Sequence, residues 1–123
     1  MDFNRQVILL SLVLLAGCST NVRIGDTEYP PRARDYQIEV FFAPDAGALV
    51  LDKFEDDARP ARETPINAVE IGRTDSAGIG YGSMLGSARS AARKFGGDGV
   101  IIHGFTTVGW DTYLTTTIIR WKP

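Results

Sequence analysis

The alternation of hydrophobic and polar residues predicts four β-strands after residue 35. The pattern is clearest in residues 36–43, where Gln37 and Glu39 alternate with apolar side chains. β-Branched residues dominate the last predicted strand, which also favours strand over helix. The predicted strands cover residues 36–43, 67–74, 99–107 and 112–121, and we expect the last two to form a hairpin.

One stretch, residues 83–95, has the period of a helix instead. Gly96 and Gly97 follow it, and a glycine directly after a helix is typical of a left-handed cap. We expect one face of this helix to pack on the sheet, and the segment from Val69 to Ile102 to form a right-handed crossover between two parallel neighbouring strands. The residues on the predicted buried face are Leu85, Ala88, Ala92 and Phe95.

These elements predict an α+β domain, with a small sheet of about four strands and one helix packed on one face, in the order β-β-α-β-β. Residues 48–66 fit least well, because Pro60 and Pro65 exclude a long helix there. We expect a short strand or a helical turn around residues 49–54. The acidic residues of this segment lack the spacing of a calcium loop, so we interpret them as a solvated surface; they are Asp52, Glu55, Asp56 and Asp57.

The N-terminus has a different pattern, which is typical of a secretory signal peptide. Arg5 precedes an apolar run from Val7 to Leu15, and the small residues Ala16 and Gly17 follow. The run is far shorter than the roughly 20 residues that a membrane-spanning helix needs. We therefore expect it to direct export and not to remain as a membrane span.

The chain's single cysteine directly follows these small residues. Leu15-Ala16-Gly17-Cys18 resembles the lipobox of bacterial lipoproteins. The resemblance implies that the Cys18 thiol receives a diacylglycerol, that cleavage precedes Cys18, and that the new amino group is acylated. Ser19, in place of an Asp, implies sorting to the outer membrane with the domain facing the periplasm. The alternative is a structural cysteine that follows an ordinary signal peptide.

We accordingly divide the chain into three parts: a signal peptide at residues 1–17, the lipidated cysteine and a flexible tether at residues 18–35, and a periplasmic domain at residues 36–123. The tether is predicted from sparse apolar residues and the Pro30-Pro31 pair. The alternative for this segment is an edge strand around Val22–Ile24.

Composition excludes nucleic acid as a partner, because the formal net charge is −2 and nucleic-acid binding needs a basic surface. With Cys18 lipidated, no cysteine remains for a disulfide. The chain therefore has to be held together by an ordinary hydrophobic core.

The glycine-rich loop at residues 75–82 precedes the helix, as in dinucleotide-binding units. However, Ser83 or Leu85 occupies the position of the third glycine, so we expect no cofactor. His103 is the only histidine, and strict alternation places it on one face with Ile101 and Phe105. Hydrolase and zinc motifs are missing from the sequence. We therefore interpret His103 as a partly buried structural residue and expect neither a catalytic nor a metal site.

Three aromatic residues near loops are candidates for binding a partner. Trp110 and Tyr113 lie at the predicted hairpin tip, and Tyr81 lies in the glycine-rich loop. Aromatic side chains of this kind anchor many protein interfaces. The alternative is that they cover the end of the sheet.

Two segments, Val69–Gly72 and Ala91–Ile102, resemble a group of small bacterial envelope proteins that includes the outer-membrane sensor lipoprotein of the Rcs stress pathway and the YbjQ-like domains. This resemblance implies a small α+β fold and a binding or signalling role without catalysis. The sensor uses disulfides in the matching domain, and this chain has none to form. The sequence thus predicts a membrane-anchored envelope lipoprotein with a non-catalytic protein-binding or stress-sensing domain. The alternatives are a structural lipoprotein that contacts peptidoglycan or lipid, and a small hydrolase or metal enzyme.

Overall fold

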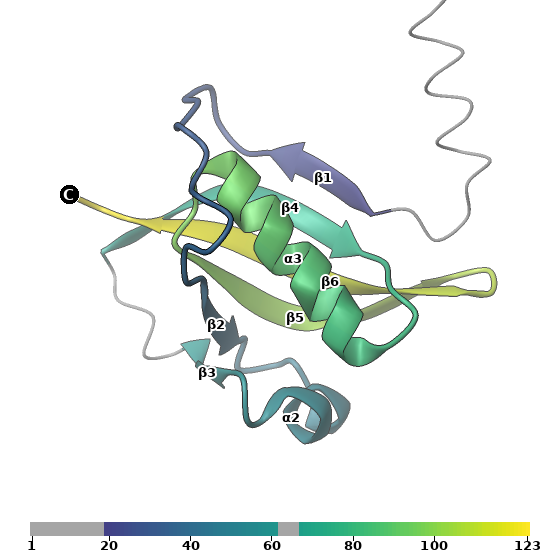
Figure 1. Cartoon of the computed structure of the whole chain (residues 1–123). Helices are drawn as coiled ribbons and strands as arrows, with labels where there is room; N and C mark the ends of the chain where they lie inside the picture. The colour runs from purple at the N-terminus through teal and green to yellow at the C-terminus, as the bar shows by residue number, and fades with distance from the viewer. Residues whose placement is uncertain (1–18, 62–66) are drawn as a thin grey trace, which may run out of the picture.

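The computed structural model describes residues 19–61 and 67–123. A six-stranded mixed sheet, in the order β1-β4-β6-β5-β2-β3, carries one long helix across one face (Figure 1). In chain order the elements are β1 (Thr20–Arg23), β2 (Glu39–Phe42), α2 (Ala48–Phe54), β3 (Arg59–Pro60), β4 (Ala68–Ser76), α3 (Tyr81–Phe95), β5 (Gly99–Val108) and β6 (Asp111–Trp121).

The predicted sheet of about four strands with a single helix is wrong, because the described residues form six strands and two helices. One additional strand is β1, which lies in the predicted tether. It pairs antiparallel with β4, so that Thr20 lies opposite Asp75 and Arg23 opposite Gly72. All four β1 residues are exposed. Backbone hydrogen bonds and a bond from the Thr74 hydroxyl to the Asn21 amide oxygen therefore hold this edge strand, and no alternation of apolar residues marks it in the sequence.

The other additional elements are short. Strand β3 pairs only two residues with β2, and Pro60 is tolerated there because an edge strand does not need every N–H. Helix α2 buries only Val50 and Phe54, and both pack into the core. Two inward residues are too few to give a helical period that can be recognised in the sequence.

The predicted crossover also differs from the structure. Strands β4 and β5 run in the same direction, but β6 lies between them and pairs antiparallel with both. Residues 116–119 of β6 are all buried, which suits a strand at the centre of a sheet. The parallel neighbours of the sheet are β2 with β5 and β2 with β3.

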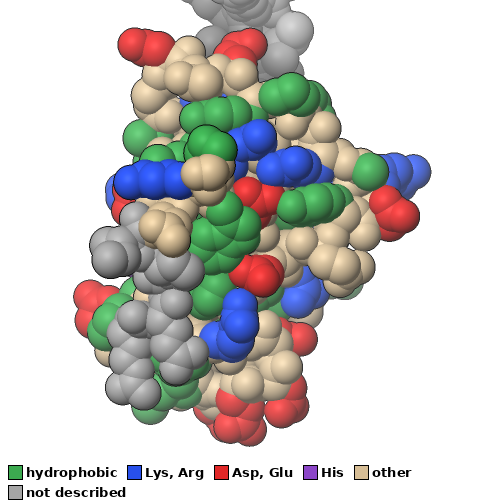
Figure 2. All heavy atoms as spheres, turned by 90° about the vertical axis from the view of Figure 1, so that its left-hand side faces the viewer, with side chains coloured by type: hydrophobic (Ala, Val, Ile, Leu, Met, Phe, Trp, Pro, Cys, Tyr) green, Lys and Arg blue, Asp and Glu red, His purple; other side chains and the backbone are tan. Residues whose placement is uncertain are grey.

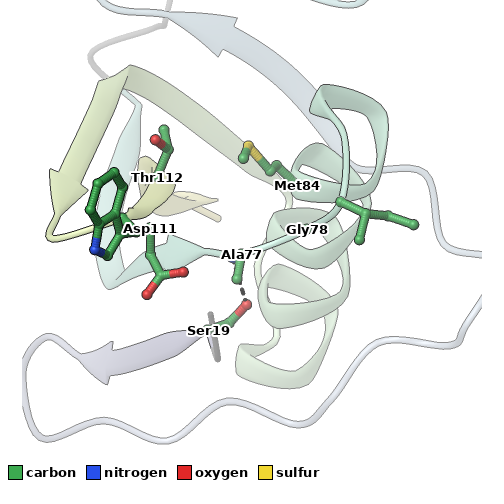
Figure 3. A pocket seen from close by; sticks show the side chains of 8 residues that line it. Ser19, Ala77, Gly78, Met84, Asp111 and Thr112 are labelled. Carbon is green, nitrogen blue, oxygen red and sulfur yellow. Dashed lines mark hydrogen bonds between the residues drawn. The ribbon is translucent and has the colours of Figure 1, made fainter. Parts of the chain in front are cut away.

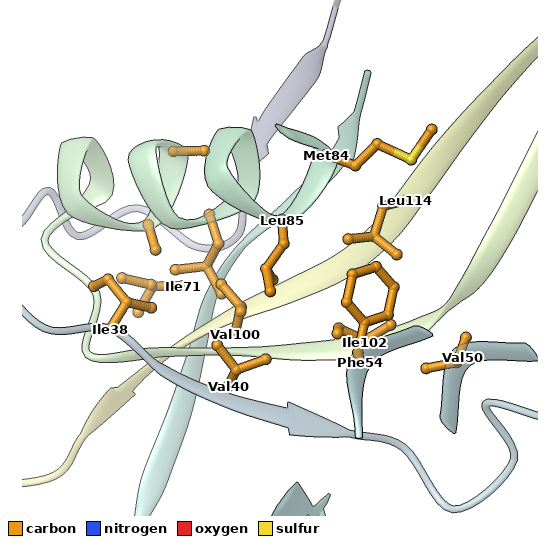
Figure 4. Packing of buried hydrophobic residues seen from close by; sticks show 13 residues of the cluster. Ile38, Val40, Val50, Phe54, Ile71, Met84, Leu85, Val100, Ile102 and Leu114 are labelled. Carbon is orange, nitrogen blue, oxygen red and sulfur yellow. The ribbon is translucent and has the colours of Figure 1, made fainter. Parts of the chain in front are cut away.

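The predicted packing of α3 is confirmed. Leu85, Ala88 and Ala92 are buried against the sheet, and Phe95 is partly buried against the same core. The small alanines let the helix approach the strands closely. Leu85 points from α3 toward Val100 of the sheet (Figure 4). The predicted cap is also confirmed, because Gly96 has a φ of 79° and its N–H bonds to carbonyls of the last helical turn.

A buried carboxylate fixes the segment before β2 onto the domain. Asp98 is only 6% exposed, and its Oδ1 accepts hydrogen bonds from Arg32 Nη2 at 2.8 Å and from the Tyr36 hydroxyl at 2.5 Å. Its Oδ2 accepts from the backbone N–H of Trp121 at 2.9 Å. The bond to Asp98, followed by burial, raises the pKa of Tyr36 above its ordinary value. Residues 32–36 are thus held in place.

Candidate functional site

An open hollow of about 500 Å³ lies where β4 ends, α3 begins and the β5–β6 hairpin turns. Figure 3 shows that Met84 of α3 and Asp111 and Thr112 of the hairpin border it together with the segment around Ala77. The complete lining is Ser19, Ala77, Gly78, Ile79, Met84, Trp110, Asp111 and Thr112. We call this surface the hairpin-end hollow.

Two fully exposed hydrophobic side chains border the hairpin-end hollow. Ile79 and Trp110 are at 106% and 102% of their reference exposed areas, the highest values among the large hydrophobic residues that the structure describes. Ile79 lies in the bend before α3, and Trp110 lies in the hairpin turn together with Gly109, whose φ is 63°. Neither side chain is therefore needed to fill the core, and both are free to contact another surface.

The loop that presents Ile79 is shaped by the start of α3. Gly80 is the N-cap residue, and the Ser83 hydroxyl donates to the Gly80 carbonyl at 3.2 Å. Gly78 lies so close to Ser83 that a side chain at this position would collide with it. Gly78 thus permits the tight entry into α3.

Ser19 ties the N-terminal end of the described chain to the same surface. Its hydroxyl accepts a hydrogen bond from the backbone N–H of Ala77 at 3.0 Å, shown as a dashed line in Figure 3. Strand β1 begins at the next residue, Thr20. Cys18, the predicted acylation site, lies outside the described residues, but it directly precedes Ser19 in the sequence. The predicted anchor is therefore one residue away from the hollow.

The three aromatic candidates are not brought together. Trp110 lines the hollow, whereas Tyr81 packs its ring against Phe54 and Phe105, with centroid distances of 6.3 and 5.4 Å. Tyr113 is partly buried in β6, where it lies opposite Thr106. Among these three aromatics only Trp110 borders the hollow, and Tyr81 contributes to internal packing.

His103 does not share a face with Phe105, contrary to the sequence interpretation. The register of β5 and β6 shifts between Ile102 and Gly104, and this bulge turns Phe105 toward Phe54. His103 is exposed, and its Nε2 lies 2.6 Å from the Thr117 hydroxyl. Across residues 19–61 and 67–123, no group of three or more His, Cys, Asp or Glu residues could hold a metal ion.

The acidic segment after α2 borders a second open hollow of about 480 Å³, which Arg59 also lines. Its residues Glu55, Asp56 and Asp57 are exposed, and Asp57 lies 3.9 Å from Arg89. An exposed ion pair of this length contributes little. The segment has the character of a solvated surface.

The opposite end of the molecule carries more charged side chains than the hairpin-end hollow. Figure 2 views the side that is on the left of Figure 1, away from the hairpin tip, and there acidic, basic and hydrophobic side chains are interspersed.

Among the residues that line the hollow, the sequence indicated Trp110 as a contact residue but did not single out Ser19, Ile79 and Met84. Ile79 did carry a signal, because it is an isolated large apolar residue among glycines.

None of the helices in the described part of the chain is long and apolar enough to cross a membrane. In comparisons with known proteins, no family model, no curated protein and no solved structure matches this chain. The resemblance to the Rcs sensor and to the YbjQ-like domains therefore rests on the residues quoted above alone.

Proposed function

We propose that this protein is an envelope lipoprotein, acylated at Cys18, whose periplasm-facing domain works by non-catalytic binding through the hairpin-end hollow. The observation that carries the proposal is the position of Ser19. It is hydrogen-bonded to the domain at the edge of the surface that displays Ile79 and Trp110. The predicted anchor and the most exposed hydrophobic side chains thus share one end of the domain.

The proposal replaces a free tether with a short connection. Strand β1 begins two residues after Cys18, and Arg32 and Tyr36 are bound to Asp98 further along the same segment. A domain attached in this way stays near the outer membrane and does not reach far into the periplasm. Its partner is then an envelope component that comes close to the membrane. A stress-sensing role would need the same kind of contact.

Metabolic labelling with a palmitate analogue tests the anchor. The wild type should be labelled and Cys18→Ser should not, because the thiol is the acceptor of the diacylglycerol. Ser19→Ala is the matched control: it alters the next residue but keeps the cysteine, and it should be labelled like the wild type. Equal labelling of wild type and Cys18→Ser would contradict the proposal.

Photo-crosslinking in intact cells tests the contact surface. A photoreactive residue at position 110 should form adducts with a protein or with lipid of the envelope, because Trp110 is fully exposed beside the predicted anchor. The control is the same residue at position 122, an exposed position at the far end of β6. Similar adduct yields at the two positions would show that the hairpin end is not a preferred contact surface, which would contradict the proposal.

A further inference from the structure

The hairpin-end hollow mixes polar and apolar surface and is nearly uncharged. Among the described residues that line it, Asp111 is the single charged side chain, and there is no Lys or Arg. Ile79 and Trp110 project from two different loops on its border and are fully exposed to water. The surface can therefore gain free energy by removing apolar area from water, but it offers no basic group to an anionic ligand.

The length of chain between this surface and the predicted lipid is very short. Ser19 is fixed to Ala77 by a 3.0 Å hydrogen bond, and Cys18 is the preceding residue. Consecutive Cα atoms are about 3.8 Å apart. Acyl chains attached to Cys18 must therefore enter the bilayer next to the hollow, and its exposed side chains must lie close to the lipid surface.

The chemistry of the two side chains fits that location. Tryptophan is enriched at membrane–water interfaces, because its ring is largely apolar while its N–H can still bond to water or headgroups. Isoleucine favours the region of the acyl chains. A lipid surface also fits better than a protein groove, because the hollow is open and its two hydrophobic residues sit on separate turns.

We propose that Ile79 and Trp110 insert into the bilayer interface beside the acyl chains of Cys18, so that the domain stands on the membrane with its hairpin end down. The inference rests on the proposed acylation and adds that lipid, not protein, is the partner of this surface. Insertion gives the domain a second attachment point and a fixed orientation. Trp121, at the other end of β6, would then lie up to about 36 Å from the bilayer interface.

The test uses the acylated protein in vesicles of phosphatidylcholine and phosphatidylethanolamine whose acyl chains are brominated, because bromine quenches nearby tryptophan. In a Trp121→Phe variant, Trp110 should lose fluorescence in brominated vesicles and be shielded from acrylamide in the water. In a Trp110→Phe variant, Trp121 should not be quenched by the lipid. Ile79→Asp should restore Trp110 fluorescence, whereas Leu49→Asp, at an exposed residue of α2 outside the hollow, should not.

Adding phosphatidylglycerol should leave the quenching unchanged, because no basic side chain among the described residues lines the surface. Quenching that requires phosphatidylglycerol would overturn apolar insertion. An acylated protein with unquenched Trp110 would overturn this inference alone, and a protein crosslinked at position 110 in cells would then assign the surface to a protein partner. A protein without acyl groups at Cys18, as determined by mass spectrometry, would overturn the proposed function and this inference together.

Discussion

Removing the carboxylate of Asp98 should release the segment before β2 and weaken the whole domain. Asp98 is buried, and it accepts hydrogen bonds from Arg32, from Tyr36 and from the backbone of Trp121. Arg32 and Tyr36 belong to the segment before β2, whereas Trp121 is the last residue of β6, so the carboxylate joins two parts of the chain that are far apart in the sequence. Asp98→Ala would leave the Arg32 guanidinium and the Trp121 N–H without this acceptor.

The magnitude follows from the burial of each donor. A hydrogen bond to a charged group contributes about 1.5–3 kcal/mol, and such contributions are not additive. The Arg32 side chain is 26% exposed, so water replaces part of what it loses. We therefore expect Asp98→Ala to lower the free energy of unfolding by about 3 kcal/mol, a large share of the roughly 5–15 kcal/mol that holds most domains together. Asp98→Asn should lose about half as much, because its amide oxygen can still accept while its NH₂ faces one donor.

Urea denaturation of the folded domain measures this loss, and the melting temperature should fall by roughly 12 °C or more for Asp98→Ala. Asp45→Asn, at an exposed carboxylate in the loop before α2, is the matched control and should change the free energy by less than about 0.5 kcal/mol. If Asp98→Ala behaves like this control, the network does not hold the segment before β2.

Two further predictions separate packing from surface roles and test the phenol at Asp98. Tyr81→Ala should destabilise the domain by about 1 kcal/mol, because the Tyr81 ring packs on Phe54 and Phe105 although 40% of the residue is exposed. Trp110→Ala should change stability by less than about 0.5 kcal/mol. Thermal melts check both, and equal losses would contradict the assignment. Because the pKa of Tyr36 is raised in the folded state, the contribution of Tyr36 to stability is complete below the unfolded pKa of about 10.0 and is lost as the pH rises through the higher folded value. Urea unfolding on either side of pH 10 should therefore show a smaller loss of stability at alkaline pH for Tyr36→Phe than for the wild type. Identical losses in the two proteins would refute this.

The sequence predicts those parts of the fold in which a repeated pattern faces the core. Helix α3 buries residues at regular helical spacing, so its length and inner face could be predicted. Strand β1 was only the alternative to a tether, because all of its residues are exposed and most of its hydrogen bonds belong to the backbone. The central place of β6 depends on pairing across the sheet, and neither its length nor its composition fixes that.

The candidate site was only partly visible for a related reason. Trp110 stands out as an aromatic residue at a turn, but the hollow also needs Ser19 and Met84, which come from distant segments. The bulge between Ile102 and Gly104 is similarly invisible to strict alternation, and it reverses the face predicted for Phe105. Residues that the fold brings together from several elements leave no local pattern to recognise.

The order of the strands has a consequence for when the domain can fold. Strand β6 is the last described strand in chain order, yet it fills the gap between β4 and β5. Until it has been synthesised, each of these two strands has an unpaired edge and the sheet cannot close. A nascent chain therefore stays unfolded for nearly all of its synthesis. This delay would keep an exported chain in the extended state that it needs to pass through a secretion channel.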